Sequence, residues 1–214
     1  MYLYPLGIRL WHALNAILII ILIITGISMQ YTDKGNLVFI IDFAAAVKWH
    51  NITAIILVIS YIFFLILNIV SGNAKYYRIN RNNLFSDLGK QFRYYVSGMF
   101  KGEKHPFPVS MESKFNPLQK LTYVLIMYAG LPLIIISGFG MMFPEITIVK
   151  LFGVSGFILT DILHITMAFL VTVFLVIHIY TCTLGTKPTS LFRGMITGYH
   201  EPEEESPEEV SPEK

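Results

Sequence analysis

The sequence predicts an all-α membrane protein, with four transmembrane helices in an up-and-down bundle and both termini in the cytoplasm. Of its 214 residues, 54% are hydrophobic and only 14% are charged, whereas about 25% of a typical soluble domain is charged. Four apolar runs are each long enough to cross a hydrocarbon layer of about 30 Å. Basic residues concentrate in the loop between the second and third runs. Together these observations exclude an ordinary soluble domain.

The four predicted spans are each longer than twenty residues, the length that a transmembrane helix needs. The apolar part of the first run is too long for a signal peptide, so we expect it to be retained as a span. Pro132 lies in the middle of the third run, where a membrane helix tolerates a kink. The predicted spans cover residues 6–29, 43–70, 117–143 and 157–184.

The orientation follows from the loop at residues 71–116. This loop carries eight Lys or Arg residues against three Asp or Glu residues. Cytoplasmic loops of membrane proteins carry an excess of Lys and Arg. The loop is therefore predicted to be cytoplasmic, which places both termini on the same side.

Residues 86–100 of this loop place Leu88, Phe92, Tyr95 and Met99 at helical spacing. This pattern predicts a short amphipathic helix. Such a helix could lie on the inner membrane surface or pack against the bundle, and the pattern fits both arrangements.

The domain organisation is simple. Residues 1–198 are predicted to form one transmembrane domain, and the Pro- and Glu-rich residues 199–214 a disordered acidic tail. No internal repeat is evident. The single cysteine, Cys182, cannot form an internal disulfide and is interpreted as a packing residue.

Two histidines, His164 and His178, stand in the fourth run fourteen residues apart. At about 100° and 1.5 Å per residue, both leave one helix face, about 21 Å apart along the axis. A single histidine in an apolar run could equally be a buried polar residue bonded to a neighbouring helix. Two on one face, each with a partner at matching depth, indicate ligands.

The predicted topology supplies those partners. His12 begins the first span and so lies near the cytoplasmic side, at the depth of His178. His50 begins the second span and so lies near the outer side, at the depth of His164. Depth therefore predicts an inner pair, His12 with His178, and an outer pair, His50 with His164.

Two bis-histidine sites in a four-helix membrane bundle predict two b-type haems, whose iron accepts two axial imidazoles. Zinc fits poorly, because each depth offers two histidines and no cysteine, and Asp161 alone would not complete a tetrahedral set. Arg9, near the inner pair, is counted among the inner-face cofactor-binding residues as a candidate partner for a haem propionate. It could equally be an interface arginine that extends to water.

The sequence also resembles a known family, the cytochrome b subunits of formate dehydrogenase, thiosulfate reductase and nickel–iron hydrogenase (the prokaryotic cytochrome b561-like group). The resemblance covers about residues 5 to 200 and implies the same ligand pairing as the depth argument. It is carried by His164 and His178 together with the runs RLWHALN at 9–15, KWH at 48–50, KFNPLQK at 114–120 and FRGMITG at 192–198.

The resemblance further implies a quinone site at the inner face, for menaquinone or ubiquinone. Asn116 matches the family's polar residue there, and Gln119 lies close by in the sequence. The family's run reads Asn-x-Gly-Gln, whereas here Pro117 and Leu118 separate the two side chains. Asn116 could also simply cap the third span ahead of Pro117.

On these grounds we expect a dihaem membrane-anchor subunit in a prokaryotic cytoplasmic membrane. It would carry electrons between a quinone pool and an iron–sulfur or multihaem subunit, with a catalytic subunit, at the outer face. The resemblance does not fix the direction of flow. The alternative is a haem-free membrane scaffold, or a transporter that moves protons or metal through its histidines; the scarcity of acidic residues in the spans argues against a proton relay.

Overall fold

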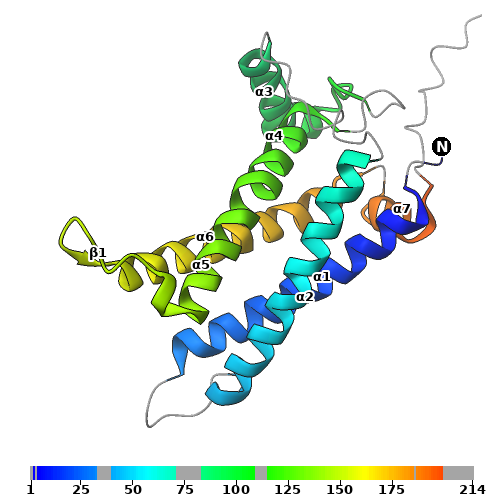
Figure 1. Cartoon of the computed structure of the whole chain (residues 1–214). Helices are drawn as coiled ribbons and strands as arrows, with labels where there is room; N and C mark the ends of the chain where they lie inside the picture. Colours follow the sequence, from blue (N-terminus) through cyan, green and yellow to red (C-terminus); the bar gives the residue numbers. More distant parts are fainter. Residues whose placement is uncertain are drawn as a thin grey trace, which may run out of the picture. The chain divides into compact units, whose positions relative to one another are not determined.

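The computed structural model describes residues 2, 4–32, 40–70, 83–108, 115–185 and 187–199. In this part of the chain, four helical segments are long and apolar enough to cross a membrane (Figure 1). Their ends lie within two residues of the predicted ones, which confirms the all-α class and four helices able to span a membrane. The orientation of the termini stays a prediction, and the acidic tail beyond Tyr199 lies outside the described residues. The segments are α1 (Leu6–Tyr31), α2 (Phe43–Val70), α4 to α5 (Pro117–Met142) and α6 (Gly156–Cys182).

Shorter elements connect these helices. The link from α5 to α6 holds a small antiparallel hairpin in which Lys150 pairs with Ser155 (Figure 1). Its turn residues Phe152 and Gly153 have φ of 51° and 81°, the left-handed conformation that a tight two-residue hairpin turn requires. The shorter elements are α3 (Leu84–Arg93), η2 (Tyr94–Gly98), η3 (Met99–Lys101), α4 (Pro117–Leu125), η4 (Ile126–Gly130), α5 (Leu131–Met142), η5 (Pro144–Ile146), β1 (Lys150–Leu151), β2 (Val154–Ser155) and α7 (Ser190–Thr197).

The chain divides into two compact units. We call Met1–Leu14 with Phe174–Lys214 the terminal unit, and Asn15–Val173 the central unit. The boundary between the two units cuts through α1 and α6, and the predicted domain limits stay a prediction. Each of the two units is described by itself below.

Polar bonds join helices inside the central unit. The Asn15 amide donates to the Ser60 hydroxyl at 2.9 Å, and both side chains are buried. The Asn68 amide donates to the Tyr128 hydroxyl at 2.6 Å. The hydrophobic effect contributes little to the association of helices within a membrane, because lipid tails are as apolar as the helix surfaces. Each such bond therefore helps to hold the helices together, by about 0.6 kcal/mol on average.

The third span is irregular where Pro132 was predicted to bend it. Its helix widens into a π-helical segment, η4, directly before Leu131 and Pro132. Proline lacks the N–H of a regular helical turn and its ring clashes with the preceding turn. The Tyr61 hydroxyl donates to the Met127 carbonyl at 2.7 Å, and so satisfies a backbone oxygen within the widened turn.

The predicted loop helix is present as α3, and η2 and η3 extend it to Lys101. Of the four residues predicted to share an apolar face, Phe92 is 62% exposed and the other three are half-buried, while the polar Gln91 is fully buried. The exposed apolar residues of this helical segment follow one another at intervals of seven and four positions, so they share one helix face. This arrangement favours the interpretation that α3 lies on a membrane surface over the alternative of packing into a bundle. The exposed residues are Phe85, Phe92, Val96 and Phe100.

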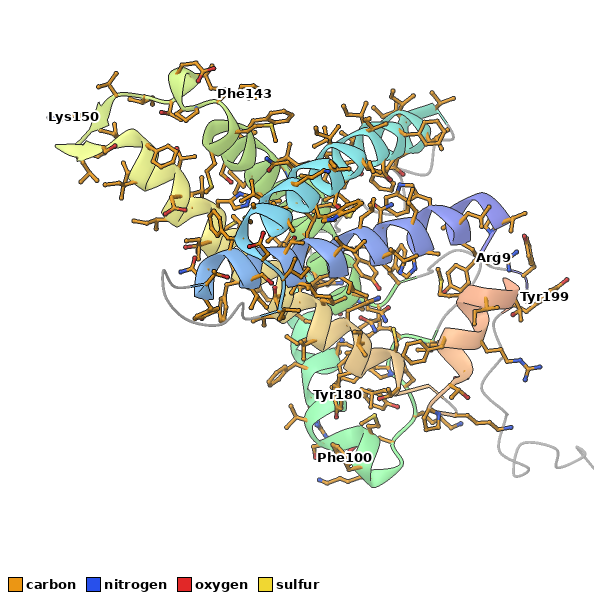
Figure 2. All side chains as sticks on the ribbon, turned by 90° about the horizontal axis from the view of Figure 1, so that it is seen from below. Arg9, Phe100, Phe143, Lys150, Tyr180 and Tyr199 are labelled. Atoms are coloured by element: carbon orange, nitrogen blue, oxygen red, sulfur yellow. The ribbon has the colours of Figure 1, made fainter. Side chains whose placement is uncertain are left out.

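In the terminal unit, the two chain ends meet. The Tyr4 N–H donates to the Gly198 carbonyl at 3.3 Å, and the rings of Tyr2 and Tyr199 pack edge to face at 5.3 Å. Gly198 has φ of +89°, and a Cβ there would lie 2.7 Å from the Tyr2 ring. Glycine at this position therefore permits both the backbone turn and the close ring contact. Figure 2 labels Arg9 and Tyr199 at the same end of this unit.

Candidate functional site: two facing pairs of histidines

The central unit brings His50 of α2 and His164 of α6 together. Their ring centroids lie 6.3 Å apart, with an interplanar angle of 69°. Both side chains are half-buried. The structure therefore pairs the two histidines that the depth argument had paired.

The terminal unit brings His12 of α1 and His178 of α6 together in the same way. Their ring centroids lie 6.2 Å apart, with an interplanar angle of 56°. Phe174, one turn earlier on α6, stacks on the His178 ring at 5.7 Å. The Cys182 sulfur lies 4.0 Å from His178 Nε2, so this cysteine packs beside a candidate ligand.

Both pairs have the spacing that one shared metal atom requires. A metal–imidazole bond is about 2 Å long and a ring nitrogen lies about 1 Å from its ring centre, so opposed ligands place their centroids about 6 Å apart. No group of three His, Cys, Asp or Glu side chains that could hold a metal ion gathers within the described ranges. Haem iron needs two protein ligands only, because the porphyrin supplies the others. The residues present therefore fit a haem at each pair.

The His50 ring is held by a hydroxyl from α1. Thr25 Oγ1 lies 2.9 Å from His50 Nδ1 and donates its own hydrogen to the Ile21 carbonyl at 2.7 Å. With its hydrogen placed there, the oxygen can accept from Nδ1–H in the tautomer that carries a hydrogen on Nδ1. The neutral ring then has its lone pair on Nε2, the nitrogen free to bind a metal.

His164 has the equivalent arrangement. Ser137 Oγ of α5 lies 3.1 Å from His164 Nδ1 and donates to the Leu133 carbonyl at 2.8 Å. Thr25 and Ser137 are 1% and 2% exposed, so water does not compete for either bond. Each ring of this pair is thus oriented from behind by one buried hydroxyl.

Glycines make room for these two rings. A Cβ at Gly26 would lie 3.6 Å from His50 Cε1, and a Cβ at Gly138 would lie 3.2 Å from His164 Cε1. The second distance is closer than ordinary van der Waals contact. Gly26 of the first span and Gly138 of the third span therefore accommodate the two imidazole rings.

A second polar cluster surrounds the start of α4. The Asn116 carboxamide oxygen accepts from the Gln119 N–H at 2.9 Å, and the Gln119 side chain accepts from the Asn116 N–H at 3.3 Å. This reciprocal pair is a capping box ahead of Pro117, so the interpretation of Asn116 as a helix cap is confirmed. The remaining Asn116 donor, Nδ2, bonds to the Tyr95 hydroxyl at 2.9 Å.

Gln91 lies in this cluster with its amide near the Tyr95 hydroxyl, but without a hydrogen bond of regular geometry among the described residues. It is fully buried, and neither amide atom has a hydrogen-bond partner in the part of the chain that the structure describes. Burial raises the pKa of the Tyr95 hydroxyl, while the nearby Asn116 and Gln91 amides act in the opposite direction. A buried amide without a partner is unfavourable by about 1–3 kcal/mol, which marks the position as one that a ligand could satisfy.

Arg9 belongs to the terminal unit, whereas Asn116 and Gln119 belong to the central one. Its guanidinium donates to the Ile196 carbonyl, and its Nε is buried without a partner among the described residues. The structure therefore assembles Asn116 with Gln119 and leaves Arg9 beside α7.

Sequence reasoning missed three functional candidates, Thr25, Ser137 and Gln91. Thr25 and Ser137 are small polar residues inside apolar spans, where a hydroxyl is usually taken to bond its own helix backbone. A signal was available: residues 23–29 read IITGISM and residues 135–141 read IISGFGM, a short internal repeat that had been overlooked. Gln91 gave no signal, because a glutamine in a charged loop is expected to face water.

A four-helix membrane protein with two facing imidazole pairs has the architecture of a membrane-bound cytochrome. The chain belongs to the prokaryotic cytochrome b561 family, which it matches over residues 3–198. It is also 36% identical over 203 residues to an Escherichia coli (strain K12) protein named "Putative cytochrome YdhU", a match that covers 93% of this chain and 74% of that protein. No solved structure matches the chain. The family implies haem b and electron transfer in a prokaryotic membrane.

Proposed function

We propose that this protein is the dihaem membrane-anchor subunit of a respiratory oxidoreductase complex. It would pass electrons between a quinone pool and a partner subunit on the outer side of the membrane. The observation that supports this most directly is the equal spacing of two imidazole pairs, 6.2 Å and 6.3 Å between centroids. Two sites of one kind in one chain suit a relay better than a single catalytic centre.

His12 with His178 would hold one haem b, and His50 with His164 the other. When bound, each haem supplies a one-electron redox centre. With two imidazoles as its protein ligands, each haem would suit electron transfer better than binding of a substrate at iron. In this proposal the protein's own contribution is to fix the ligand nitrogens and to surround them with apolar helices.

The polar cluster at the start of α4 is our candidate for the quinone headgroup. Asn116 and Gln119 fit the resemblance noted above, but their capping box uses most of their hydrogen-bonding capacity. Gln91 adds a buried amide whose donor and acceptor have no partner of regular hydrogen-bond geometry within the described ranges. A quinone carbonyl needs a donor, and a quinol hydroxyl needs an acceptor, so one amide could serve both forms. Arg9, which binds the Ile196 carbonyl, stays a proposed inner-face cofactor residue.

We further propose that both termini face the cytoplasm and that the connection between α5 and α6 faces outward. The partners would then be an iron–sulfur or multihaem subunit and a catalytic subunit on the outer side. Quinone chemistry at the inner face would exchange protons with the cytoplasm. Each electron that crosses the membrane potential changes the free energy by about 2.3 kcal/mol per 100 mV.

The test is a purified, detergent-solubilised full-length chain. We expect a reversible haem b spectrum, two haems per chain by pyridine haemochrome assay, and reduction of the haems by a quinol analogue. The Gln91→Met variant should keep both haems and lose quinol reduction. The His105→Ala variant, which changes a histidine outside the two pairs, is the matched control. A single haem per chain, or none, contradicts the proposal.

The alternative function is a haem-free scaffold or a transporter that uses the same histidines. It predicts a colourless protein after expression with ample haem supply. It also predicts that histidine variants alter transport of protons or metal in vesicles without any change in absorbance.

A further inference from the structure

We infer that Thr25 and Ser137 are a matched pair of positioning residues that set the tautomer and the electron donation of His50 and His164. The inference rests on the proposed haem between these two histidines. Each hydroxyl oxygen lies within hydrogen-bond distance of one Nδ1, at 2.9 Å and 3.1 Å. Nothing in the family match assigns a role to either hydroxyl.

The direction of both bonds follows from the helix backbone. Thr25 donates to the Ile21 carbonyl and Ser137 to the Leu133 carbonyl, each four residues earlier. Because each hydroxyl has one hydrogen and directs it to that carbonyl, we assign its oxygen as the acceptor of the histidine Nδ1–H. Each imidazole is therefore held with Nδ1 protonated and Nε2 bare, the form that ligates iron.

The two contacts belong to one repeated device. Residues 23–29 and 135–141 share two isoleucines, a hydroxyl residue, a glycine and a methionine in the same order. The hydroxyl residue precedes its histidine by 25 positions in the first case and by 27 in the second. Gly26 and Gly138 directly follow the hydroxyls, and each faces the same ring as its neighbour. In each of the two helix pairs, α1 with α2 and α5 with α6, a hydroxyl residue followed by a glycine contacts a histidine of the next helix.

The arrangement has an electronic consequence. A hydrogen-bond acceptor on Nδ1–H makes the imidazole a stronger electron donor through Nε2. Stronger donation stabilises ferric over ferrous iron, which lowers the reduction potential of the haem. Because one hydroxyl stands behind each of the two histidines, both ligands of the proposed haem would become stronger electron donors.

The experiment is an equilibrium redox titration of the full-length holoprotein, followed optically and by EPR. The variants Thr25→Val, Ser137→Ala and their combination remove the acceptors with little change in volume. We expect one haem to shift to a more positive potential, furthest in the double variant, with a changed EPR signal, and the other haem to stay unchanged. Thr25→Ser should restore the wild-type potential.

The matched control is Thr172→Val. Thr172 makes the same type of bond to the Ala168 carbonyl at 2.8 Å, so its replacement tests the loss of a membrane threonine alone. The inference is overturned if the double variant keeps both haems with unchanged potentials and EPR signals, and also if Thr172→Val gives the same shift. Loss of one haem in Thr25→Val supports it if Thr25→Ser recovers that haem, and opposes it if Thr25→Ser does not. A wild-type protein without haem would instead refute the proposed function.

Discussion

The imidazole rings of His12 and His178 face each other with centroids 6.2 Å apart. These residues come from opposite ends of the sequence, 166 positions apart, yet both belong to the terminal unit. The backbone bond from Tyr4 to Gly198 and the bond from Arg9 to Ile196 join the same two stretches of chain. The chain ends therefore hold this pair together.

We expect His178→Ala to reduce the haem content from two to one per chain, because one axial nitrogen is lost from only one pair. His12→Ala should remove the same haem, and His164→Ala the other one. Haem stoichiometry and redox titration together identify which haem is missing. Two haems in any of these variants would refute the pairing.

The two glycines beside the His50–His164 pair should differ in how well they tolerate substitution by alanine. A methyl group at Gly138 would lie 3.2 Å from the His164 ring, whereas one at Gly26 would lie 3.6 Å from the His50 ring. Gly138→Ala should therefore displace its ligand and lower haem occupancy, while Gly26→Ala should leave occupancy near the wild-type value. Equal occupancy in the two variants would show that the ring contact at Gly138 does not constrain the ligand.

Two substitutions at Asn116 should separate its role as a helix cap from its proposed role in quinone binding. Asn116→Ala removes the N-cap acceptor and should lower stability by about 1 kcal/mol. Asn116→Ser keeps a cap acceptor but loses the amide that donates to Tyr95. We expect Ser to recover thermal stability and to remain slow in quinol oxidation. Full recovery of both properties would leave Asn116 with the capping role alone.

Gln91→Met should raise stability and impair quinol reaction. The wild-type amide is buried without a hydrogen-bond partner among the described residues, an unfavourable term of about 1–3 kcal/mol that methionine removes at similar volume. Thermal unfolding in detergent and single-turnover quinol kinetics measure the two effects. A variant that is both more stable and fully active would exclude Gln91 from quinone binding.

The Tyr95 hydroxyl should make stability depend on pH in the alkaline range. Its pKa in the folded protein is raised above the ordinary value of 10.0, chiefly by burial. Above that ordinary value the unfolded state ionises while the folded state stays neutral. The contribution of the neutral Tyr95 side chain to stability is therefore fully present below pH 10. It is lost as the pH rises through the folded pKa. Tyr95→Phe should flatten this decline in unfolding experiments.

The sequence by itself determined the four spans and the two histidine pairs. Apolar length fixes where a helix can cross a membrane, and the regular helical rise converts the positions of His164 and His178 into depths. The helix cap at Asn116 was also predictable as one of two alternatives, because capping depends on residues adjacent in sequence.

Only the tertiary structure decided which side chains support the ligands. Thr25 lies 25 positions from His50, and no local rule relates a hydroxyl on one helix to a ring on the next. The full burial of Gln91 was not predictable, and the exposure of Phe92 favoured the membrane-surface arrangement of α3 over the packed one, a choice that the sequence had left open. A helix that meets lipid places its apolar residues outward, and which face does so depends on packing between elements far apart in the chain.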